Sequence, residues 1–235
     1  MRPSAGERGF YARFWRIASS GAPWYGTGYP VLVKVSAVIT LYTLKPRFQA
    51  LLRPLVGRLA AAGVTANQVT IAAAVGSVAV GLLVAAADAR VLFLLLPVWL
   101  GLRMALNAID GMLAREFGQI SRLGAYLNEA GDVISDAALL APFAFVAPFG
   151  AVATGVVIFL SVLTEFVGVL GPVRRYDGPM GKSDRALVAG VLGAWIGFGG
   201  ALPSWLGLLM PVLGVLLLLT VVNRVRAGLR DTPTG

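Results

Sequence analysis

The 235-residue chain contains no cysteine and no histidine. Without cysteine, disulfide bonds, thiolate metal sites and cysteine nucleophiles are excluded. Without histidine, the chain has no histidine-bound zinc, no Ser-His-Asp triad and no imidazole to act as a general base near neutral pH. Any chemistry must therefore come from carboxylates, amides, hydroxyls, lysine, arginine or a hard metal ion.

Charge is also scarce. Charged residues make up 13% of the chain, against about 25% in ordinary soluble domains. Apolar residues make up 57%, and the mean hydropathy is +0.80. A soluble domain of this size cannot bury so much apolar surface, which indicates an integral membrane protein. The net charge of +9 lies mostly beside apolar segments, which favours contact with anionic lipid or phosphate over nucleic acid.

Six apolar stretches predict an all-α integral membrane fold with six transmembrane helices, because each is close to the length that crosses a bilayer. They cover residues 69–87, 91–110, 133–149, 151–173, 186–201 and 204–223. Of the 20 lysines and arginines, 18 fall on one side of these stretches. The positive-inside rule therefore places both termini in the cytoplasm.

The flanking segments are of a different kind. Residues 1–44 are interpreted as an N-terminal tail, and residues 226–235 as a C-terminal tail. Residues 45–62 combine apolar positions with Lys45, Arg47, Arg53 and Arg58, which predicts a cytoplasmic amphipathic helix on the membrane surface. Membrane anchoring alone is one interpretation of that helix. The Thr-Asn pair in TANQVT (65–70) is typical of a helix start.

Polar side chains gather at one end of the second and third apolar stretches, where charge is rare and usually functional. They form two groups with helical spacing: Asn107 and Asp110, then Asn128, Asp132 and Asp136. A polar link over residues 111–131 is expected to set the two groups opposite each other. Oxygen ligands of this kind suit Mg²⁺ or Mn²⁺, and such an ion would bind and polarise a phosphate or pyrophosphate.

This segment resembles the signature of the CDP-alcohol phosphatidyltransferases, D-x2-D-G-x2-A-R-x8-G-x3-D-x3-D. The spacing agrees throughout, and positions 107 and 128 carry Asn, as in a bacterial branch of that family. The segments TANQVT and GKSDRA (181–186) are also similar to the family. The resemblance covers about residues 45–225, which is taken as the membrane domain.

The resemblance implies a homodimeric, six-helix enzyme of the bacterial cytoplasmic membrane. It would transfer a phosphatidyl group from a CDP-linked lipid, most of all CDP-diacylglycerol, to a small polar alcohol and release CMP. It also implies roles for particular residues. Asp110 would be a metal ligand, and Asp132 would be a metal ligand and a candidate base. Gly111 and Gly124 would allow close approach to the nucleotide. Ala114 would pack against the nucleotide, and Arg115 would contact a phosphate.

The chain departs from the family signature at two metal positions. An Asn carbonyl can bind a hard cation but brings no charge, so one ion in place of two is an option. Interhelical hydrogen bonding without metal is the alternative for Asn107 and Asn128. Asp136, as a further metal ligand, and Glu165 are candidates to restore charge, and structural pairing, for instance with Arg103, is the alternative for both.

A second cluster is basic and lies between the fourth and fifth stretches. It comprises Arg174, Arg175, Tyr176, Lys182 and Arg185. Its cations are candidates to bind a phosphate on the acceptor or the diphosphate of the donor. A pure topology signal is the alternative interpretation.

Three other functions remain open. A related enzyme could exchange phospholipid head groups without a cytidine donor, and a catalytically degenerate homologue would bind lipid only. A transporter is the weakest option, because the polar residues cluster at one face of the membrane.

Overall fold

The computed structural model describes residues 41–170 and 173–230, with side chains from residue 47 onward. Every regular element within these residues is a helix, which confirms the all-α prediction. The N-terminal tail up to residue 40 lies outside the described residues. The predicted domain limits stay predictions, although the helices run from Leu41 to Arg230.

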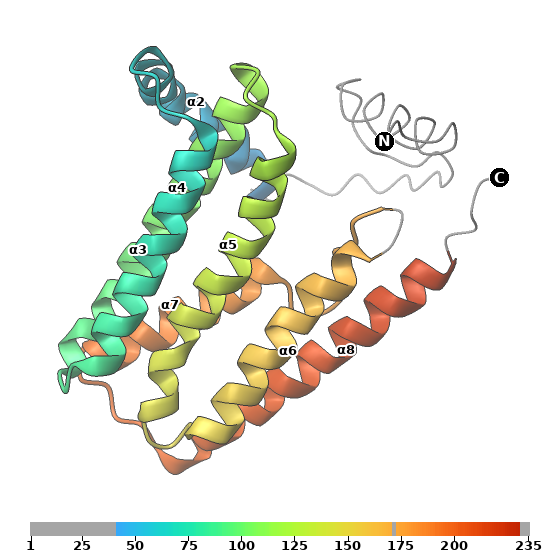
Figure 1. The fold of residues 1–235 in the computed structure, drawn as a ribbon. Coiled ribbons are helices and arrows are strands. Elements are labelled where there is room, and N and C mark those ends of the chain that lie inside the picture. Colours follow the sequence, from blue (N-terminus) through green and yellow to red (C-terminus); the bar gives the residue numbers. More distant parts are fainter. Residues whose placement is uncertain (1–40, 171–172, 231–235) are drawn as a thin grey trace. The chain divides into compact units, whose positions relative to one another are not determined.

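Seven α-helices and three short 3-10 helices make up the described part of the chain (Figure 1). In chain order they are α2 (Leu41–Ala61), α3 (Ala66–Ala86), η1 (Arg90–Leu94), α4 (Leu95–Glu116), α5 (Arg122–Leu140), η2 (Ala141–Phe145), α6 (Ala151–Val169), α7 (Lys182–Gly197), η3 (Ser204–Leu208) and α8 (Leu209–Arg230).

Four of these segments are long and apolar enough to cross a membrane. They are Ala66–Ala86, Arg90–Glu116, Ala151–Val169 and Ser204–Arg230. Large apolar side chains on them face outward, among them Leu82 and Phe159, each 65% exposed, which suits lipid better than water. α5 carries several charges and α7 has only 16 residues. An integral membrane protein is thus supported, whereas six spans remain a prediction.

α3 connects α4 and α5, because each of these two helices packs against it. α5 also contacts α6, α6 lies beside α8, and α7 packs on α4 (Figure 1). The largest apolar cluster joins these helices through fully buried side chains such as Phe143, Leu96 and Ile196. A bundle of this kind fixes the relative positions of polar groups on its inner faces.

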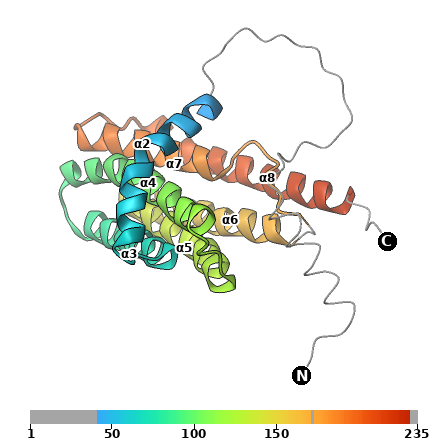
Figure 2. The ribbon, with the colours of Figure 1, turned by 90° about the horizontal axis from the view of Figure 1, so that it is seen from above.

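α2 runs across the direction of the other helices, as the rotated view shows (Figure 2). Its Val56 is buried in a second apolar cluster with residues of α3 and α4. Arg53 donates to both carboxylate oxygens of Glu116, at 3.2 and 2.9 Å, at the end of α4. The helix predicted over 45–62 is therefore present, and its place on a membrane surface stays a prediction.

The expected polar link over residues 111–131 is wrong in its extent. α4 continues to Glu116 and α5 begins at Arg122, so only residues 117–121 are not helical. Ser121 accepts a hydrogen bond from the backbone N–H of Gly124 at 2.9 Å and so caps α5. Gln119 accepts from the backbone N–H of Ala66 at 2.7 Å, which ties this short loop to the start of α3.

Small residues let α3 and α5 approach closely. A Cβ added at Gly81 of α3 would lie 2.2 Å from the backbone oxygen of Ala138 in α5. At the other end of the same contact, a Cβ added at Gly124 would lie 2.8 Å from Oδ1 of Asn67. The distance between α3 and α5 therefore depends on glycine at both ends.

We predict that Gly81→Ala lowers the free energy of unfolding by about 1–3 kcal/mol, because the backbone of α5 would have to move away. The matched control is Gly155→Ala in α6, where an added Cβ meets nothing within 4 Å. The control should be neutral or stabilising, because alanine favours helix more than glycine does. Thermal unfolding in detergent measures both, and equal stability of the two variants would contradict the packing described here.

Candidate functional site

Asp110 lies on the buried face of α4 and is 8% exposed. Its Oδ2 accepts a hydrogen bond from Oγ1 of Thr70 at 2.9 Å. Thr70 stands in the first turns of α3, a helix that Thr65 opens with a capping box to Gln68. The helix start read from TANQVT thus places a hydroxyl on the predicted metal ligand.

Arg103 joins α4 to α5. Its Nη2 donates to Oδ1 of Asp132 at 2.9 Å, and its Nη1 donates to Oδ1 of Asp136 at 3.0 Å. The guanidinium is almost completely buried, with a side-chain exposure of 5%. These contacts connect α4 to α5 near Asn107 and Asn128, each of which lies one helical turn from a member of the pair.

Lys182, the first residue of α7, forms an ion pair with Oδ2 of Asp132. Two hydrogen bonds from the backbone just before α7 fix the start of this helix. The backbone N–H of Gly181 donates to Oδ2 of Asp184 at 2.8 Å, and that of Met180 donates to Oγ1 of Thr220 in α8 at 3.1 Å. Asp110 lies within electrostatic range of Asp132 and Lys182.

A buried ion-pair network lies behind this site. Nη2 of Arg185 donates to Oδ2 of Asp136 at 2.9 Å and to Oε1 of Glu165 at 3.0 Å. Nη1 of Arg185 donates to Oγ1 of Thr164 at 3.2 Å, and Arg224 donates to the backbone oxygen of Thr164. Both oxygens of Asp136 therefore accept from arginine, one from Arg103 and one from Arg185. In this structure Asp136 and Glu165 take part in structural pairing.

The predicted basic cluster divides into two parts. Lys182 and Arg174 are partly open, with side-chain exposures of 29% and 30%, whereas Arg185 is 4% exposed. Arg174 pairs with Glu129 and Glu165 and stacks its guanidinium 5.3 Å from the ring centre of Tyr176.

Arg175 donates to the backbone oxygen of Ala227 in α8 at 3.2 Å. The cluster is thus both a rim of accessible cations and part of the buried network.

Gly111, Ala114 and Arg115 follow Asp110 along α4. The guanidinium of Arg115 is exposed and folds back over Gly111, where an added Cβ would lie 2.9 Å from its Nη2. An exposed arginine next to a bare backbone position suits the phosphate contact expected for Arg115.

Several members of the site were not singled out from the sequence. They are Thr70, Glu129, Thr164 and Arg224. Arg224 carried a usable signal, since a charge near the end of an apolar span is rare and usually functional. The two threonines carried none, because hydroxyls are common in membrane helices as internal hydrogen-bond donors.

The donor set fits a hard cation only in a limited way. Within residues 41–170 and 173–230, no three Asp, Glu, His or Cys side chains group closely enough to hold a metal ion. Asp110, Asp132 and the amide oxygens of Asn107 and Asn128 offer oxygen ligands of the type that Mg²⁺ and Mn²⁺ prefer. The oxygens of Asp132 are already paired with Arg103 and Lys182, so a metal ion there would replace a cation of the chain itself.

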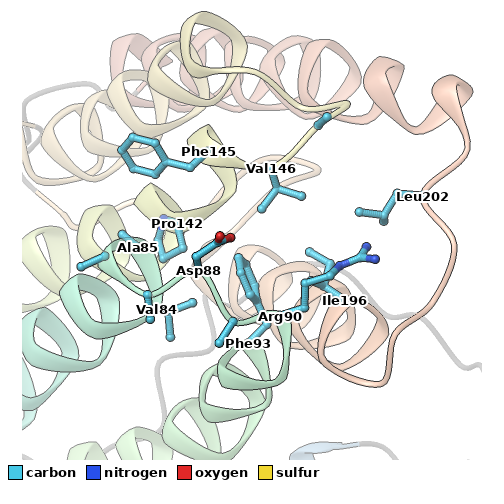
Figure 3. Close-up of a pocket in the computed structure, with 14 residues that line it drawn as sticks. Val84, Ala85, Asp88, Arg90, Phe93, Pro142, Phe145, Val146, Ile196 and Leu202 are labelled. Carbon is cyan, nitrogen blue, oxygen red and sulfur yellow. The ribbon is translucent and has the colours of Figure 1, made fainter.

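A pocket of about 390 Å³ opens at the other end of the bundle (Figure 3). Asp88, Arg90, Phe145 and Val146 are among its lining residues. Asp88 follows the last turn of α3, whereas Thr70 lies in its first turns. At 1.5 Å per residue that is a separation of about 27 Å, so the pocket is not part of the carboxylate site.

The fold and the carboxylate site together define a polytopic helical membrane protein with a charged centre between its helices. The same fold occurs in the phosphatidylinositol phosphate synthase of Mycobacterium tuberculosis. Its structure with CDP-DAG bound has a TM-score of 0.62 and 24% identity, covering 77% of this chain and 94% of the synthase. Its complex with manganese and citrate has a TM-score of 0.63, again with 24% identity, over 77% and 90% of the two chains.

No protein-family model matches the chain. The inner membrane protein YnbA of Escherichia coli is 49% identical over 195 residues, which cover 81% of this chain and 97% of that protein. The chain belongs to the family of this inner membrane protein.

We predict that Arg224→Met lowers the free energy of unfolding by about 1–3 kcal/mol, because the backbone oxygens of Thr164 and Asp177 lose their donor. Arg226→Met is the matched control: Arg226 is on the same helix and exposed, so its loss should change stability by less than about 0.5 kcal/mol. Thermal unfolding in detergent measures both variants. A network that contributes nothing would leave the two equally stable.

Proposed function

We propose that this protein is a membrane phosphatidyltransferase that moves the phosphatidyl group of CDP-diacylglycerol to a small polar alcohol and releases CMP. The observation that carries the proposal is that Asp132 of α5 is paired with Lys182 of α7, and that Asp110 of α4 lies within electrostatic range of both. The fold shared with a synthase whose structure holds CDP-DAG supports it.

The proposed setting is a six-span protein of the inner membrane with both termini in the cytoplasm, working as a homodimer. The excess of lysine and arginine at the ends of the spans near the site supports this orientation. The donor's acyl chains would then lie in the bilayer, with its cytidine near the loop that joins α4 to α5. Gly111, Ala114 and Gly124 would line the path of the nucleotide, and α2 would lie on the membrane surface.

A divalent ion, Mg²⁺ or Mn²⁺, would be held by Asp110, with Asn107 and Asn128 as neutral ligands and Asp132 beside them, and its chemistry would be to neutralise charge on the diphosphate. Asp136 is less suitable as a ligand than Asp132, since both its oxygens accept from buried arginines, whereas one oxygen of Asp132 is paired with the accessible Lys182. The complex of the related fold with manganese supports the choice of a divalent ion.

The reaction would be an in-line displacement. The acceptor's hydroxyl oxygen forms a bond to the phosphatidyl phosphorus, and the bond from that phosphorus to the oxygen of CMP breaks. Asp132 takes the hydroxyl proton. It is suited to this because it lies between the helices at the open side of the network, with a side-chain exposure of 14%.

The cations of the site would bind and orient the anionic groups. Arg115 and Lys182 are placed to contact the diphosphate, because both are accessible and border the carboxylates. Arg174 and Arg175 lie on the α6–α7 side and would receive the acceptor, whose own phosphate, if present, would suit them. Arg185 is engaged with Asp136 and Glu165 and would act by holding the helices in place.

We predict that Asp110→Asn abolishes transfer without unfolding the protein, and that Asp132→Asn lowers the rate by about 10²–10⁴-fold, the usual range for a lost general base. The assay uses purified protein in detergent, labelled CDP-diacylglycerol and a pool of polar alcohols. Release of CMP and the mass of the lipid product are measured with Mg²⁺ and with EDTA. Asp88→Asn, at the other end of the bundle, should retain full activity.

Full activity of Asp110→Asn would refute the site assignment. A lipid product formed without any cytidine nucleotide would favour head-group exchange. Neither CMP release nor a new lipid across the pool would favour a lipid-binding homologue.

A further inference from the structure

Asp132 differs from Asp110 in what surrounds its carboxylate. Oδ1 of Asp132 accepts from Arg103 at 2.9 Å, and Oδ2 is paired with Lys182. Asp110 instead accepts from the neutral hydroxyl of Thr70. One acid of the site is therefore already neutralised by cationic side chains of the chain itself, and the other is bonded to an uncharged partner.

The two cations on Asp132 are not equivalent. Arg103 is 5% exposed and is fixed by hydrogen bonds to the side chains of both Asp132 and Asp136. Lys182 is 29% exposed, stands at the first position of α7 and has a long flexible stem. When a more strongly anionic group enters the site, Lys182 can leave Asp132, whereas Arg103 is held in place.

Charge limits how many metal ions such a site can take. A first divalent ion would bind at Asp110, whose Oδ2 accepts from a neutral hydroxyl, with Asn107 and Asn128 as its proposed amide ligands. A second would have to sit at Asp132 beside the fixed positive charge of Arg103, with no further carboxylate to offset it, because Asp136 is bound by Arg103 and Arg185. A second ion bound to Asp132 would be repelled by the neighbouring guanidinium of Arg103, because like charges repel strongly in a site shielded from water.

We infer that this centre takes one divalent ion per chain, held by Asp110, and that Lys182 supplies the second positive charge on the donor's diphosphate. The inference rests on the proposed function. It gives Lys182 two positions, on Asp132 before the donor binds and on the diphosphate afterwards.

The test is a titration of the purified full-length protein with Mn²⁺, in which electron paramagnetic resonance counts the free ion. We expect one Mn²⁺ per chain, with or without CDP-diacylglycerol. Lys182→Met should bind Mn²⁺ about tenfold more tightly, since a cation is removed beside the ligands, and should raise the KM for CDP-diacylglycerol. Lys182→Arg should keep both values near those of the unaltered protein.

Two further variants sharpen the result. Arg90→Met removes the same charge in η1, 20 residues or about 30 Å before Asp110 along the chain, and should alter neither metal affinity nor KM. The triple variant Asn107→Asp, Asn128→Asp, Lys182→Met should bind two Mn²⁺ ions, since it supplies two carboxylates and removes the competing cation.

Two ions on the unaltered protein, or a Lys182→Met variant with unchanged Mn²⁺ affinity, would overturn this inference and leave the proposed transfer intact. No bound Mn²⁺ together with CMP release would also overturn it. No bound Mn²⁺ and no CMP release would overturn both this inference and the proposed function.

Discussion

The structure depends on ion pairs between arginine and carboxylate in the interior of a membrane helix bundle. Arg103 connects α4 to α5, and Arg185 connects α7 to both α5 and α6. Neither charge could remain buried alone, because an unpaired ion in a low-dielectric interior is far too costly. The same pairs that keep the helices in register therefore also orient Asp132, so stability and the proposed chemistry share one set of contacts.

The site combines buried cations with fixed partners and accessible cations that can exchange theirs. Three arginines are buried, and each forms several hydrogen bonds or ion pairs: Arg103, Arg185 and Arg224. Lys182 and Arg174 are instead accessible at the edge of the site. Substrate phosphates can compete for the rim cations without disturbing the interior pairs. A fixed inner network with exchangeable outer cations is well suited to binding and releasing a highly charged donor, because the helices need not move.

Much of this was predictable from the sequence. The four strongest spans agree with apolar runs, because hydropathy reports lipid-facing helices directly. The start of α5 was missed by about ten residues, since its polar first half, from Arg122 to Asp132, has no apolar signal and is set by the Ser121 cap. The spacing of the acids indicated which faces meet. The sequence offered Arg103 as a partner of Asp136, which the structure shows, but not of Asp132, because that second contact depends on how α4 and α5 both pack on α3.

The central claim is that Asp110 and its neighbours hold a divalent ion against the donor's phosphate. Pulsed electron–nuclear double resonance of the protein loaded with Mn²⁺ and CDP-diacylglycerol tests it most directly. The account predicts a ³¹P hyperfine coupling of a directly bound phosphate, and its loss in Asp110→Asn. Bound Mn²⁺ without any ³¹P coupling, or a coupling unchanged in Asp110→Asn, would contradict it.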